Sequence, residues 1–448
     1  MERVDVLVAG AGAAGLTAAL ASADRGASVI VAEVSETFGT NSNTAMSTAM
    51  LPAAGTRWQR EAGVEDAPEI FLADVMAKSK GQADPGLSVA LTTSARDVAT
   101  WLADACGVPF ELVTDFNYPG HSRLRCHTVA DRSGRSLLEH LLAATRARRL
   151  IDIVAPLRLL AVGRAHEGLR ATVQAPGREP ETVIANRVIL ACNGFGANAS
   201  MVTEHIPVAA NLTYHGSPTS TGDAVKIGTA LGGELAYMDA FQGHATLAMP
   251  HAILLTWAAM INGGVLLNRL GRRFTDESAG YSESALSVGA QPGGEAWALF
   301  DEQIAAVCRA FKDFQDLEAA GAVKWAVDAE QLSRITGAPL DAITRSLADV
   351  ANFASGQEGD PFARANWGRP LASPYGVVRV GGALFHTQGG LRVDDEGRVL
   401  GPDGVIPGLF AAGGAAMGIS GHGAAGYLGG NGLLSAFVLG YAAGAARS

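Results

Sequence analysis

The sequence predicts an α/β fold with an inserted α+β lobe, and three observations predict it. A strand, a glycine turn, a helix and a second strand open the chain at Val4–Glu33. Short β runs separated by turn residues follow between Ile151 and Leu190. A strand, a glycine-rich turn and a long apolar helix return at Gly408–Ser448. We therefore expect the first and last segments to share one sheet, with the middle of the chain as a separate lobe.

The opening unit carries the first sign of a ligand. Its run VDVLV, residues 4–8, is almost continuously apolar, as expected of a buried parallel strand. The sequence GAGAAG, residues 10–15, follows and opens an Ala-rich helix that extends to about Arg25. Ser28–Ala32 forms the second strand and closes on Glu33. A G-x-G-x-x-G sequence between a strand and a helix, with an acidic residue ending the next strand, predicts a Rossmann-like dinucleotide site.

Each residue of this motif has a physical role. Gly10 allows the tight turn, Gly12 lets backbone amides approach a pyrophosphate, and Gly15 lets the helix pack on the strand. The N-terminus of the helix offers oriented N–H groups to the phosphates. The Glu33 carboxylate is placed to accept hydrogen bonds from ribose hydroxyls. This unit predicts an ADP-containing cofactor but does not separate FAD from NAD.

The middle of the chain changes character twice. The runs IDIV, LRLLAV, LRATVQ and TVIANRVIL, within 151–190, predict a β-meander and a strand that ends near Asn193 and Gly194. Beyond these runs come a hairpin-like segment, GGVLLNRLGRRF, and helices at Asp328–Thr336 and Leu340–Phe353. We therefore divide the chain into a first part of a cofactor domain at 1–235, a capping domain at 236–375 and a second part of the cofactor domain at 376–448.

Composition and charge exclude several classes of partner. The net charge is −10 without a Lys/Arg block, so nucleic acid and anionic membranes are not expected partners. The four cysteines are widely spaced, which predicts reduced thiols and no disulfide or metal site. The first strand starts directly after Met-Glu-Arg, leaving no room for a signal peptide, and the apolar stretch at 433–446 is shorter than the ~20 residues of a membrane span. We expect a soluble, cytoplasmic protein.

The C-terminal glycines favour a flavin. Gly413 and Gly414 follow the strand GLFAA, and the run GGNG at 429–432 opens the last helix. A second helix N-terminus aimed at an anionic ring oxygen suits a flavin better than a nicotinamide. A glycine turn that only packs helices is the structural alternative.

Several segments together resemble one enzyme family. They are GTNSNTAMSTAMLPAAGT at 39–56, TGD at 221–223, GGVLLNRLGRRFTDE at 263–277, TQGG at 387–390 and the stretch 408–432. They resemble the flavoprotein family of fumarate reductase, succinate dehydrogenase and 3-ketosteroid Δ1-dehydrogenase. The resemblance implies a Rossmann-like FAD-binding domain with an inserted capping domain. It also implies a small-molecule substrate between cap and flavin, and hydride transfer through flavin N5 across a C–C bond.

The resemblance also implies how FAD is held. Asn41 stands where membrane-bound members carry a flavin-linked histidine, so FAD is expected to be non-covalent. No haem, FMN-carrier or iron–sulfur sequence is present, so dioxygen or a soluble electron acceptor is the expected electron partner. The expected cofactor-binding residues are Gly10, Gly12, Ala13, Ala14, Gly15, Glu33, Thr40, Asn41, Ser42, Asn43, Ser47, Thr48, Asn193, Gly194, Asp223, Gly413, Gly414, Asn431, Gly432 and Leu433.

At the substrate site the chain departs from the dicarboxylate enzymes. His244 and Thr256 match the family's substrate-facing residues, but the usual Glu beside the threonine is Trp257. The family's proton-donor arginine falls on Tyr281, and its carboxylate-clamping arginine falls on Tyr427. The substrate-binding histidine falls on Phe385, with His386 beside it.

A tyrosine in place of an arginine changes the chemistry. A guanidinium grips a carboxylate with a bidentate fork, and a phenol does not. A phenol of lowered pKa can remove a proton next to a ketone, or donate a hydrogen bond to that ketone. The ketosteroid dehydrogenases carry such a base at the position of Tyr281. We expect Tyr281 to remove the α proton while Tyr427 or the amides of Gly429 and Gly430 polarise the carbonyl. His244 and His386 complete the candidate catalytic set; each of the four side chains could instead serve packing alone.

The polar loop at 118–127 adds a last candidate feature. Arg123, Arg125 or His127 could bind a substrate carboxylate there, unless the loop is simply solvated surface. Our first hypothesis is a desaturase of a small cyclic ketone, including a keto-carboxylate such as 4-oxocyclohexanecarboxylate. The second is an oxidoreductase of di- or tricarboxylates, like fumarate reductase or tricarballylate dehydrogenase. The third is a non-catalytic flavin carrier, which would not need a substrate lid.

Overall fold

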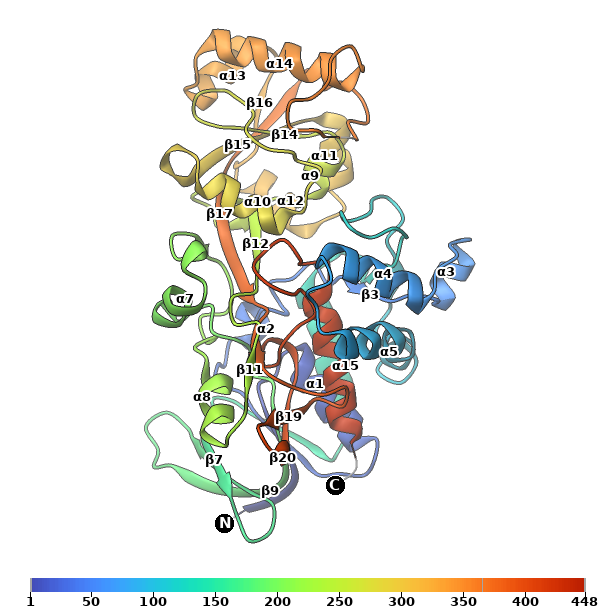
Figure 1. Cartoon of the computed structure of the whole chain (residues 1–448), viewed down its shortest axis with the longest axis vertical. Helices are drawn as coiled ribbons and strands as arrows, with labels where there is room; N and C mark the ends of the chain where they lie inside the picture. The colour runs from blue at the N-terminus through green and yellow to red at the C-terminus, as the bar shows by residue number, and fades with distance from the viewer. Residues whose placement is uncertain (1, 365, 447–448) are drawn as a thin grey trace.

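The computed structural model describes residues 2–364 and 366–446. It is elongated, with a mostly parallel sheet and both chain ends at one end and a second sheet with its helices at the other (Figure 1). The long strand β17 (Tyr375–Thr387) runs from the second sheet toward the first (Figure 1). The mixed α/β fold predicted from the sequence is confirmed.

The parallel sheet joins the two ends of the sequence. Its strands run in the order β20-β9-β1-β2-β6, and all neighbours in this series are parallel. The strand β9 (Glu181–Leu190) lies between β1 (Glu2–Ala9) and β20 (Gly404–Ala411), so first and last segments share one sheet as expected. The remaining two strands are β2 (Val29–Ala32) and β6 (Ile151–Val154).

The antiparallel meander contains fewer strands than the four β runs of the sequence suggested. The run IDIV forms β6, which pairs with β2 at the edge of the parallel sheet and not with its sequence neighbour. The antiparallel meander contains only β7 (Arg158–Arg164), β8 (Leu169–Gln174) and β9. The prediction was wrong here because a short apolar run has the same pattern in either kind of sheet.

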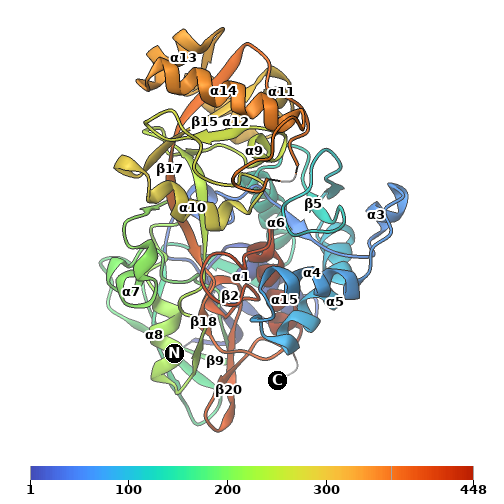
Figure 2. The same ribbon diagram turned by 45° about the horizontal axis from the view of Figure 1, so that its top comes forward.

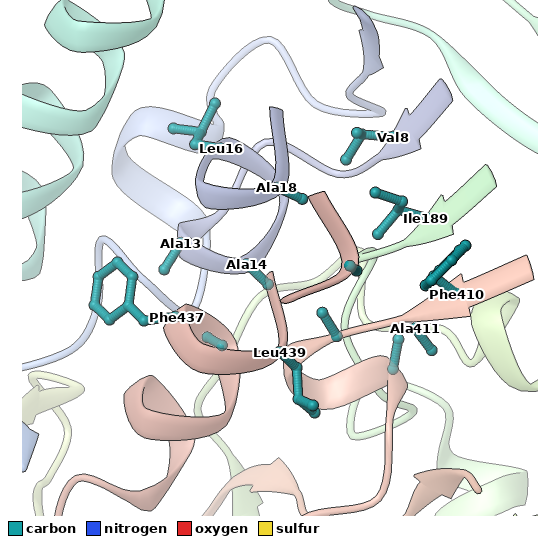
Figure 3. Close-up of a cluster of buried hydrophobic side chains, with 14 of the residues drawn as sticks. Val8, Ala13, Ala14, Leu16, Ala18, Ile189, Phe410, Ala411, Phe437 and Leu439 are labelled. Atoms are coloured by element: carbon teal, nitrogen blue, oxygen red, sulfur yellow. The ribbon is translucent and has the colours of Figure 1, made fainter. Parts of the chain in front are cut away.

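Small residues let two helices cover the parallel sheet together. The helix α1 (Ala13–Ala23) packs along α15 (Asn431–Ala445), and Figure 3 shows Ala13 and Ala14 of α1 next to the part of α15 that carries Phe437 and Leu439. A Cβ at Gly440 would lie 2.5 Å from the Ala14 carbonyl oxygen, and one at Gly444 would meet the Ala18 carbonyl. The glycines that break the apolar C-terminal stretch therefore allow two helix backbones to touch.

The part of the molecule that contains the parallel sheet has further helices and short strands. They are α2 (Phe38–Asn41), β3 (Leu51–Pro52), α3 (Arg57–Glu61), α4 (Pro68–Lys78), α5 (Pro85–Asp104), β4 (Glu111–Leu112), β5 (Cys126–Thr128), α6 (Gly134–Arg146), α7 (Ala199–His205), α8 (Asp223–Ala230), β11 (Leu235–Ala236), β18 (Gly390–Leu391) and β19 (Arg398–Gly401).

The second sheet has the central order β13 (Ile253–Leu254), β12 (Phe241–Ala248), β17, β15 (Glu295–Asp301) and β14 (Val265–Leu267). The short strands β10 (Thr213–Tyr214) and β16 (Lys324–Ala326) also pair with β17. Because β10 and β17 belong to this sheet, it reaches beyond the predicted limits 236 and 375 at both ends. The segment GGVLLNRLGRRF is not a full hairpin, since β14 pairs with β15 and only a single bridge links Leu267 to Arg273. The helices of this lobe are α9 (Ala258–Ile261), α10 (Tyr281–Gly289), α11 (Glu302–Cys308), α12 (Lys312–Ala319), α13 (Ala329–Thr336) and α14 (Leu340–Ala354).

The helix α10 lies on the side of this lobe that faces the parallel sheet (Figure 2). Two glycines of the underlying strands make room for it. A Cβ at Gly243 would lie 2.6 Å from the Ser282 carbonyl oxygen, and a Cβ at Gly382 would meet the Ala285 carbonyl. The Gly243 amide donates to the Ser282 hydroxyl at 2.9 Å, which fixes the start of α10 on β12. Tyr281, the first residue of α10, is thereby held against the strand.

Among the described residues there is neither a helix that could span a membrane nor a cluster of metal ligands. Within 2–364 and 366–446, no helix has both the length and the apolar character needed to cross a bilayer. Within the same residues, no three His, Cys, Asp or Glu side chains gather as a metal site would require.

Candidate active site

One cleft runs from the first turn of α1 to the start of α10, between the two sheets. It encloses about 1860 Å³ of space, its open mouth included. Sixteen of the expected cofactor residues line it: Gly10, Gly12, Ala13, Ala14, Glu33, Asn41, Ser42, Asn43, Ser47, Thr48, Asn193, Asp223, Gly413, Gly414, Gly432 and Leu433. So do eight of the expected catalytic and substrate residues: Tyr281, Tyr427, His244, His386, Phe385, Thr256, Trp257 and Gly430.

The dinucleotide end is built by the glycine turn after β1. Gly10 has φ +106°, and a Cβ there would lie 2.5 Å from the Ala191 carbonyl oxygen. Gly12 caps α1 without a side chain of its own, and the Thr44 hydroxyl accepts from the Ala13 amide at 2.9 Å. The other amides of this first turn can meet an anion. The Glu33 carboxylate accepts from the Ala11 amide at 2.7 Å and the Ser35 amide at 2.9 Å, while it lines the cleft. Burial raises the pKa of Glu33, and these amides oppose the rise.

The opposite wall offers polar atoms that lack partners. Gly430, with φ +90°, caps α15 without a side-chain hydrogen bond. In the described part of the chain, the buried Asn41 Oδ1 and Ser435 hydroxyl have no hydrogen-bond partner, and both residues line the cleft. A bound cofactor with polar ring atoms would supply those partners. The N-termini of α1 and α15, the Glu33 carboxylate after β2 and these unpartnered polar atoms all belong to residues of one cleft, and together they fit FAD.

Four expected cofactor residues lie outside the lining. Thr40 is exposed and its hydroxyl donates to the Thr37 carbonyl oxygen, so this expectation is not met. Gly15 acts through packing, since a Cβ there would collide with the Gly10 carbonyl. Gly194 is backed by the Thr387 side chain, and Asn431 is fully buried at the start of α15.

The substrate end of the cleft is an aromatic cluster around Tyr281. The ring of His244 stacks on Tyr281 with centroids 4.7 Å apart, and Phe385 stacks on the other side of His244 at 5.2 Å. Tyr118 and Tyr427 meet the Tyr281 ring edge to face at 5.8 Å and 6.0 Å. The lobe and the parallel-sheet part thus both contribute rings to one site.

The phenols at this end are neutral at neutral pH. Burial, with the neighbouring phenols of Tyr427 and Tyr118, raises the pKa of Tyr281 well above its ordinary value. Burial raises the pKa of Tyr427 to about 12, although the Gly432 amide, 3.3 Å from its oxygen, opposes that rise. The expectation of a lowered pKa at Tyr281 is therefore wrong for the protein alone, because the phenol is buried and, among the described residues, no Lys or Arg lines this end of the cleft.

Hydrogen bonding fixes the tautomer of His244, and both histidines of the cleft are neutral. The Nδ1 of His244 accepts from the Thr246 amide at 3.2 Å, so its Nε2 carries the proton. The Nδ1 of His386 lies 2.9 Å from the Gln388 side-chain nitrogen and 3.3 Å from the Thr387 carbonyl oxygen, and its Nε2 lies near Gly432. Burial lowers the pKa of His244 to about 3 and that of His386 to about 4. Both rings are neutral N–H donors at the cleft.

No Lys or Arg side chain lines the aromatic end in the described residues. Arg158 is the one cation in the lining, and it pairs with Asp223 at 2.7 Å near the dinucleotide end. Trp257 also keeps its polar atom away from the cleft, since its Nε1 donates to the Ala279 carbonyl oxygen at 3.2 Å. This end therefore combines apolar rings with neutral hydrogen-bond donors.

The polar loop at 118–127 covers the site but does not present its cations to it. Arg123 is exposed and donates to the carbonyls of Glu65 and Ser122. Arg125 is buried and paired with aspartates, as described below, and His127 is buried against Thr56, 2.8 Å away. The expectation that Arg123 or His127 binds a carboxylate is therefore corrected.

Several further residues line the cleft that the sequence patterns did not indicate. Tyr118 reaches it from the polar loop that had been singled out for its charges. Thr44 accepts from the Ala13 amide at 2.9 Å and so caps α1 from a distant loop, which no local pattern signals. Arg158, His215 and Gln242 also line the cleft.

The comparisons with known proteins agree with this geometry. A family described as an FAD binding domain matches residues 5–433. The chain belongs to this family. FAD is its cofactor, and the flavoproteins of fumarate reductases are among its relatives. A probable fumarate reductase of Shewanella frigidimarina is 30% identical over 99% of this chain and 74% of its own length. A fumarate reductase of Schizosaccharomyces pombe is 29% identical over 100% of this chain and 90% of its own length.

Solved structures support the same fold. The open conformation of a flavocytochrome c3 fumarate reductase has a TM-score of 0.82 and 28% identity, over 99% of this flavoprotein and 78% of that chain. A 3-ketosteroid Δ4-(5α)-dehydrogenase from Rhodococcus jostii RHA1 has a TM-score of 0.76 over 99% and 96% of the two chains. Its identity of 24% shows a shared fold alone. This flavoprotein is an FAD-dependent oxidoreductase of the class that acts on CH–CH groups.

Proposed function

We propose that this flavoprotein is a dehydrogenase that introduces a C=C bond next to the carbonyl of a small cyclic ketone. One observation carries the proposal. Tyr281 and Tyr427, where the family resemblance leads one to expect arginines, lie together at an end of the cleft that no Lys or Arg side chain lines in the described residues. A site of neutral donors and aromatic rings suits an uncharged ketone better than a dicarboxylate.

The carbonyl oxygen would be held by neutral donors. Tyr427 and Gly430 both line the cleft at the N-terminus of α15, and the Tyr427 hydroxyl and the Gly430 amide would be the donors. Donors that meet an oxygen gaining negative charge stabilise the enolate more than the ketone, which acidifies the α C–H. Removing one such donor typically costs about a hundredfold in rate.

Tyr281 would exchange the α proton. Its neighbours His244, Tyr118 and Tyr427 hold the ring from three sides, which fixes where its oxygen can lie. The acceptor would be the small fraction of Tyr281 present as phenolate. As the α C–H bond breaks, the proton would pass to this phenolate oxygen, which becomes the neutral phenol, and the α,β double bond forms. Bound FAD supplies the acceptor for the β hydrogen and its electron pair. Asn41 has no nucleophilic side chain, which supports non-covalent FAD.

The packing favours a substrate without a carboxylate. His244, Phe385 and Trp257 line this end with ring faces, and the loop cations Arg123 and Arg125 do not reach it. A keto-carboxylate such as 4-oxocyclohexanecarboxylate therefore ranks below a neutral ring of similar size. Dioxygen or a soluble acceptor would reoxidise the flavin.

A second candidate is an oxidoreductase of di- or tricarboxylates. Similarity to fumarate reductases along nearly the whole chain favours it, as do the retained His244 and Thr256, which both line the cleft. The absence of a cation at the described aromatic end weakens it. A flavin carrier without catalysis is less favoured, because a carrier needs no enclosed aromatic site.

Anaerobic mixing separates these candidates. The oxidised protein is mixed with saturated cyclic ketones, with 4-oxocyclohexanecarboxylate, and with succinate or tricarballylate; protein with reduced flavin is mixed with fumarate. Loss of the oxidised flavin's visible absorption with a neutral ketone, and formation of the enone, support the proposal. Reoxidation by fumarate without any response to ketones supports the second candidate instead.

A further inference from the structure

Behind the N-terminus of α15 lies a buried charged cluster that the proposed chemistry does not use. The Arg125 side chain is fully buried and forks onto Asp66, with Nε–Oδ2 and Nη2–Oδ1 distances of 2.9 Å and 3.0 Å. Its Nη1 donates to Asp74 at 2.5 Å, and its guanidinium lies 4.6 Å over the Phe71 ring. Such a cluster is costly to bury, and within the described residues one of its connections leads to the start of α15 at the cleft.

That connection is His121. The ring is buried between the cluster and α15: Nδ1 lies 3.5 Å from Arg125 Nη1, and Nε2 lies 2.9 Å from the Gly429 carbonyl oxygen. A guanidinium only donates, so Nδ1 must present its lone pair to Arg125. The proton is therefore on Nε2, which donates to Gly429. Burial lowers the pKa of His121 to about 4, so this neutral tautomer is the form present near neutral pH.

The hydrogen bond from His121 is made to the Gly429–Gly430 peptide group, whose opposite side belongs to the cleft. In a trans peptide the C=O and the N–H point in opposite directions, so a donor on the Gly429 carbonyl lies opposite the Gly430 amide. Gly430 lines the cleft, and within the described residues its amide has no hydrogen-bond partner. Drawing electron density toward the Gly429 oxygen makes the Gly430 N–H a stronger donor, since hydrogen bonds in a chain reinforce one another.

The peptide also has little freedom to turn. A Cβ at Gly429 would lie 2.8 Å from the Tyr118 ring, and one at Gly430 would lie 2.6 Å from Pro52. The two aspartates offset the charge of Arg125, so the effect on the peptide comes through the hydrogen bond of His121 and not through a net positive field. We infer that His121, oriented by Arg125, is a positioning residue that holds and polarises the Gly429–Gly430 peptide as the donor to an enolate-like oxygen.

This inference rests on the proposed function, and its test separates the two. The probe is 4-nitrophenol, whose phenolate oxygen imitates an enolate; nitrobenzene is the neutral comparison. Calorimetric affinities for the oxidised holoenzyme are measured for the wild type, His121→Leu and His121→Gln. His127→Leu is the matched control, since His127 is also a buried histidine of this loop but lies away from the cleft.

The wild type is expected to bind the phenolate more tightly than nitrobenzene. In His121→Leu the phenolate affinity falls about tenfold, the effect of one lost hydrogen bond, while nitrobenzene affinity changes less than about twofold. The Gln variant, whose side-chain amide can also donate to Gly429, recovers most of the loss, and the His127 variant keeps the preference.

Three outcomes overturn the inference. A wild type without preference for the phenolate removes both the enolate donor and the proposed function. A preference that survives in His121→Leu removes the role of His121 alone and leaves the proposed function standing. A changed visible flavin spectrum in His121→Leu with unchanged phenolate affinity would likewise sink the inference, because the peptide would then serve the flavin.

Discussion

The imidazole of His244 stacks on the phenol ring of Tyr281, with centroids 4.7 Å apart and an angle of 25° between the rings. The contact exists because Gly243 lets the start of α10 approach β12. It places a neutral N–H donor and a neutral phenol on one wall of the cleft. The account of the reaction depends on this pair and on Tyr427 beside it.

Replacing Tyr281 by Phe should lower turnover of a ketone substrate by about a hundredfold or more, because the residue that exchanges the α proton is lost. The ring packing remains, so flavin content and thermal stability should stay close to those of the wild type. Steady-state kinetics with matched flavin occupancy measure this. Tyr441→Phe is the control, since Tyr441 packs on Trp101 outside the cleft. An unchanged rate in the Tyr281 variant removes this residue from the mechanism.

The pH dependence follows from the raised pKa of Tyr281. The proton acceptor is the phenolate, and below its pKa the phenolate fraction rises about tenfold per pH unit. The kcat/KM for dehydrogenation should therefore climb from pH 6 to about pH 9 without a plateau. The reverse reduction, which needs the protonated phenol, should not rise over this range. A maximum near neutral pH that persists in Tyr281→Phe would contradict this assignment.

An ion pair links the two parts of the molecule close to Tyr281. Lys78 of α4 lies 2.6 Å from Glu283 Oε1, and the same oxygen accepts from the Gly280 amide that begins α10. In Lys78→Met we expect kcat/KM to fall about two- to fivefold, as for loss of a partly exposed pair, without loss of flavin. Lys80→Met, at an exposed neighbouring position, is the control. Equal rates in both variants would show that the pair does not hold α10.

The glycines of α15 predict a stability effect. In Gly440→Ala the new Cβ would lie 2.5 Å from the Ala14 carbonyl oxygen, so α15 must move away from α1. Overpacking of this kind costs about 1–3 kcal/mol, and it should also weaken FAD binding because both helices begin at the cleft. Thermal unfolding and FAD titration measure the two effects. Gly163→Ala, where a Cβ meets nothing within 4 Å, is the comparison, and equal destabilisation there would refute the packing argument.

The sequence predicted the parts of this fold that depend on local pattern. The turn at Gly10–Gly15 and the helix after Gly430 follow from residue types that allow few other conformations. The role of the run at Ile151–Val154 was misjudged, because which strand it pairs with depends on packing far along the chain. The phenols of Tyr281 and Tyr427 were found through family resemblance, but the raised pKa of Tyr281 follows from burial, which one sequence does not reveal.

The charged residues of the loop at 118–127 led to a wrong prediction of a substrate-binding cation. Arg125 looked like a substrate cation, yet it is buried between Asp66 and Asp74, which are distant in sequence. The loop residue that reaches the cleft is Tyr118, which carries no charge.

In the proposed reaction the oxidised flavoprotein takes two hydrogens from a saturated ketone. Stopped-flow mixing under anaerobic conditions with cyclohexanone and larger neutral cyclic ketones, followed by product analysis, tests it most directly. We expect rapid loss of the oxidised flavin's visible absorption and one α,β-unsaturated ketone formed per flavin reduced. Flavin that stays oxidised with every ketone, yet is reduced by succinate or tricarballylate, would contradict it.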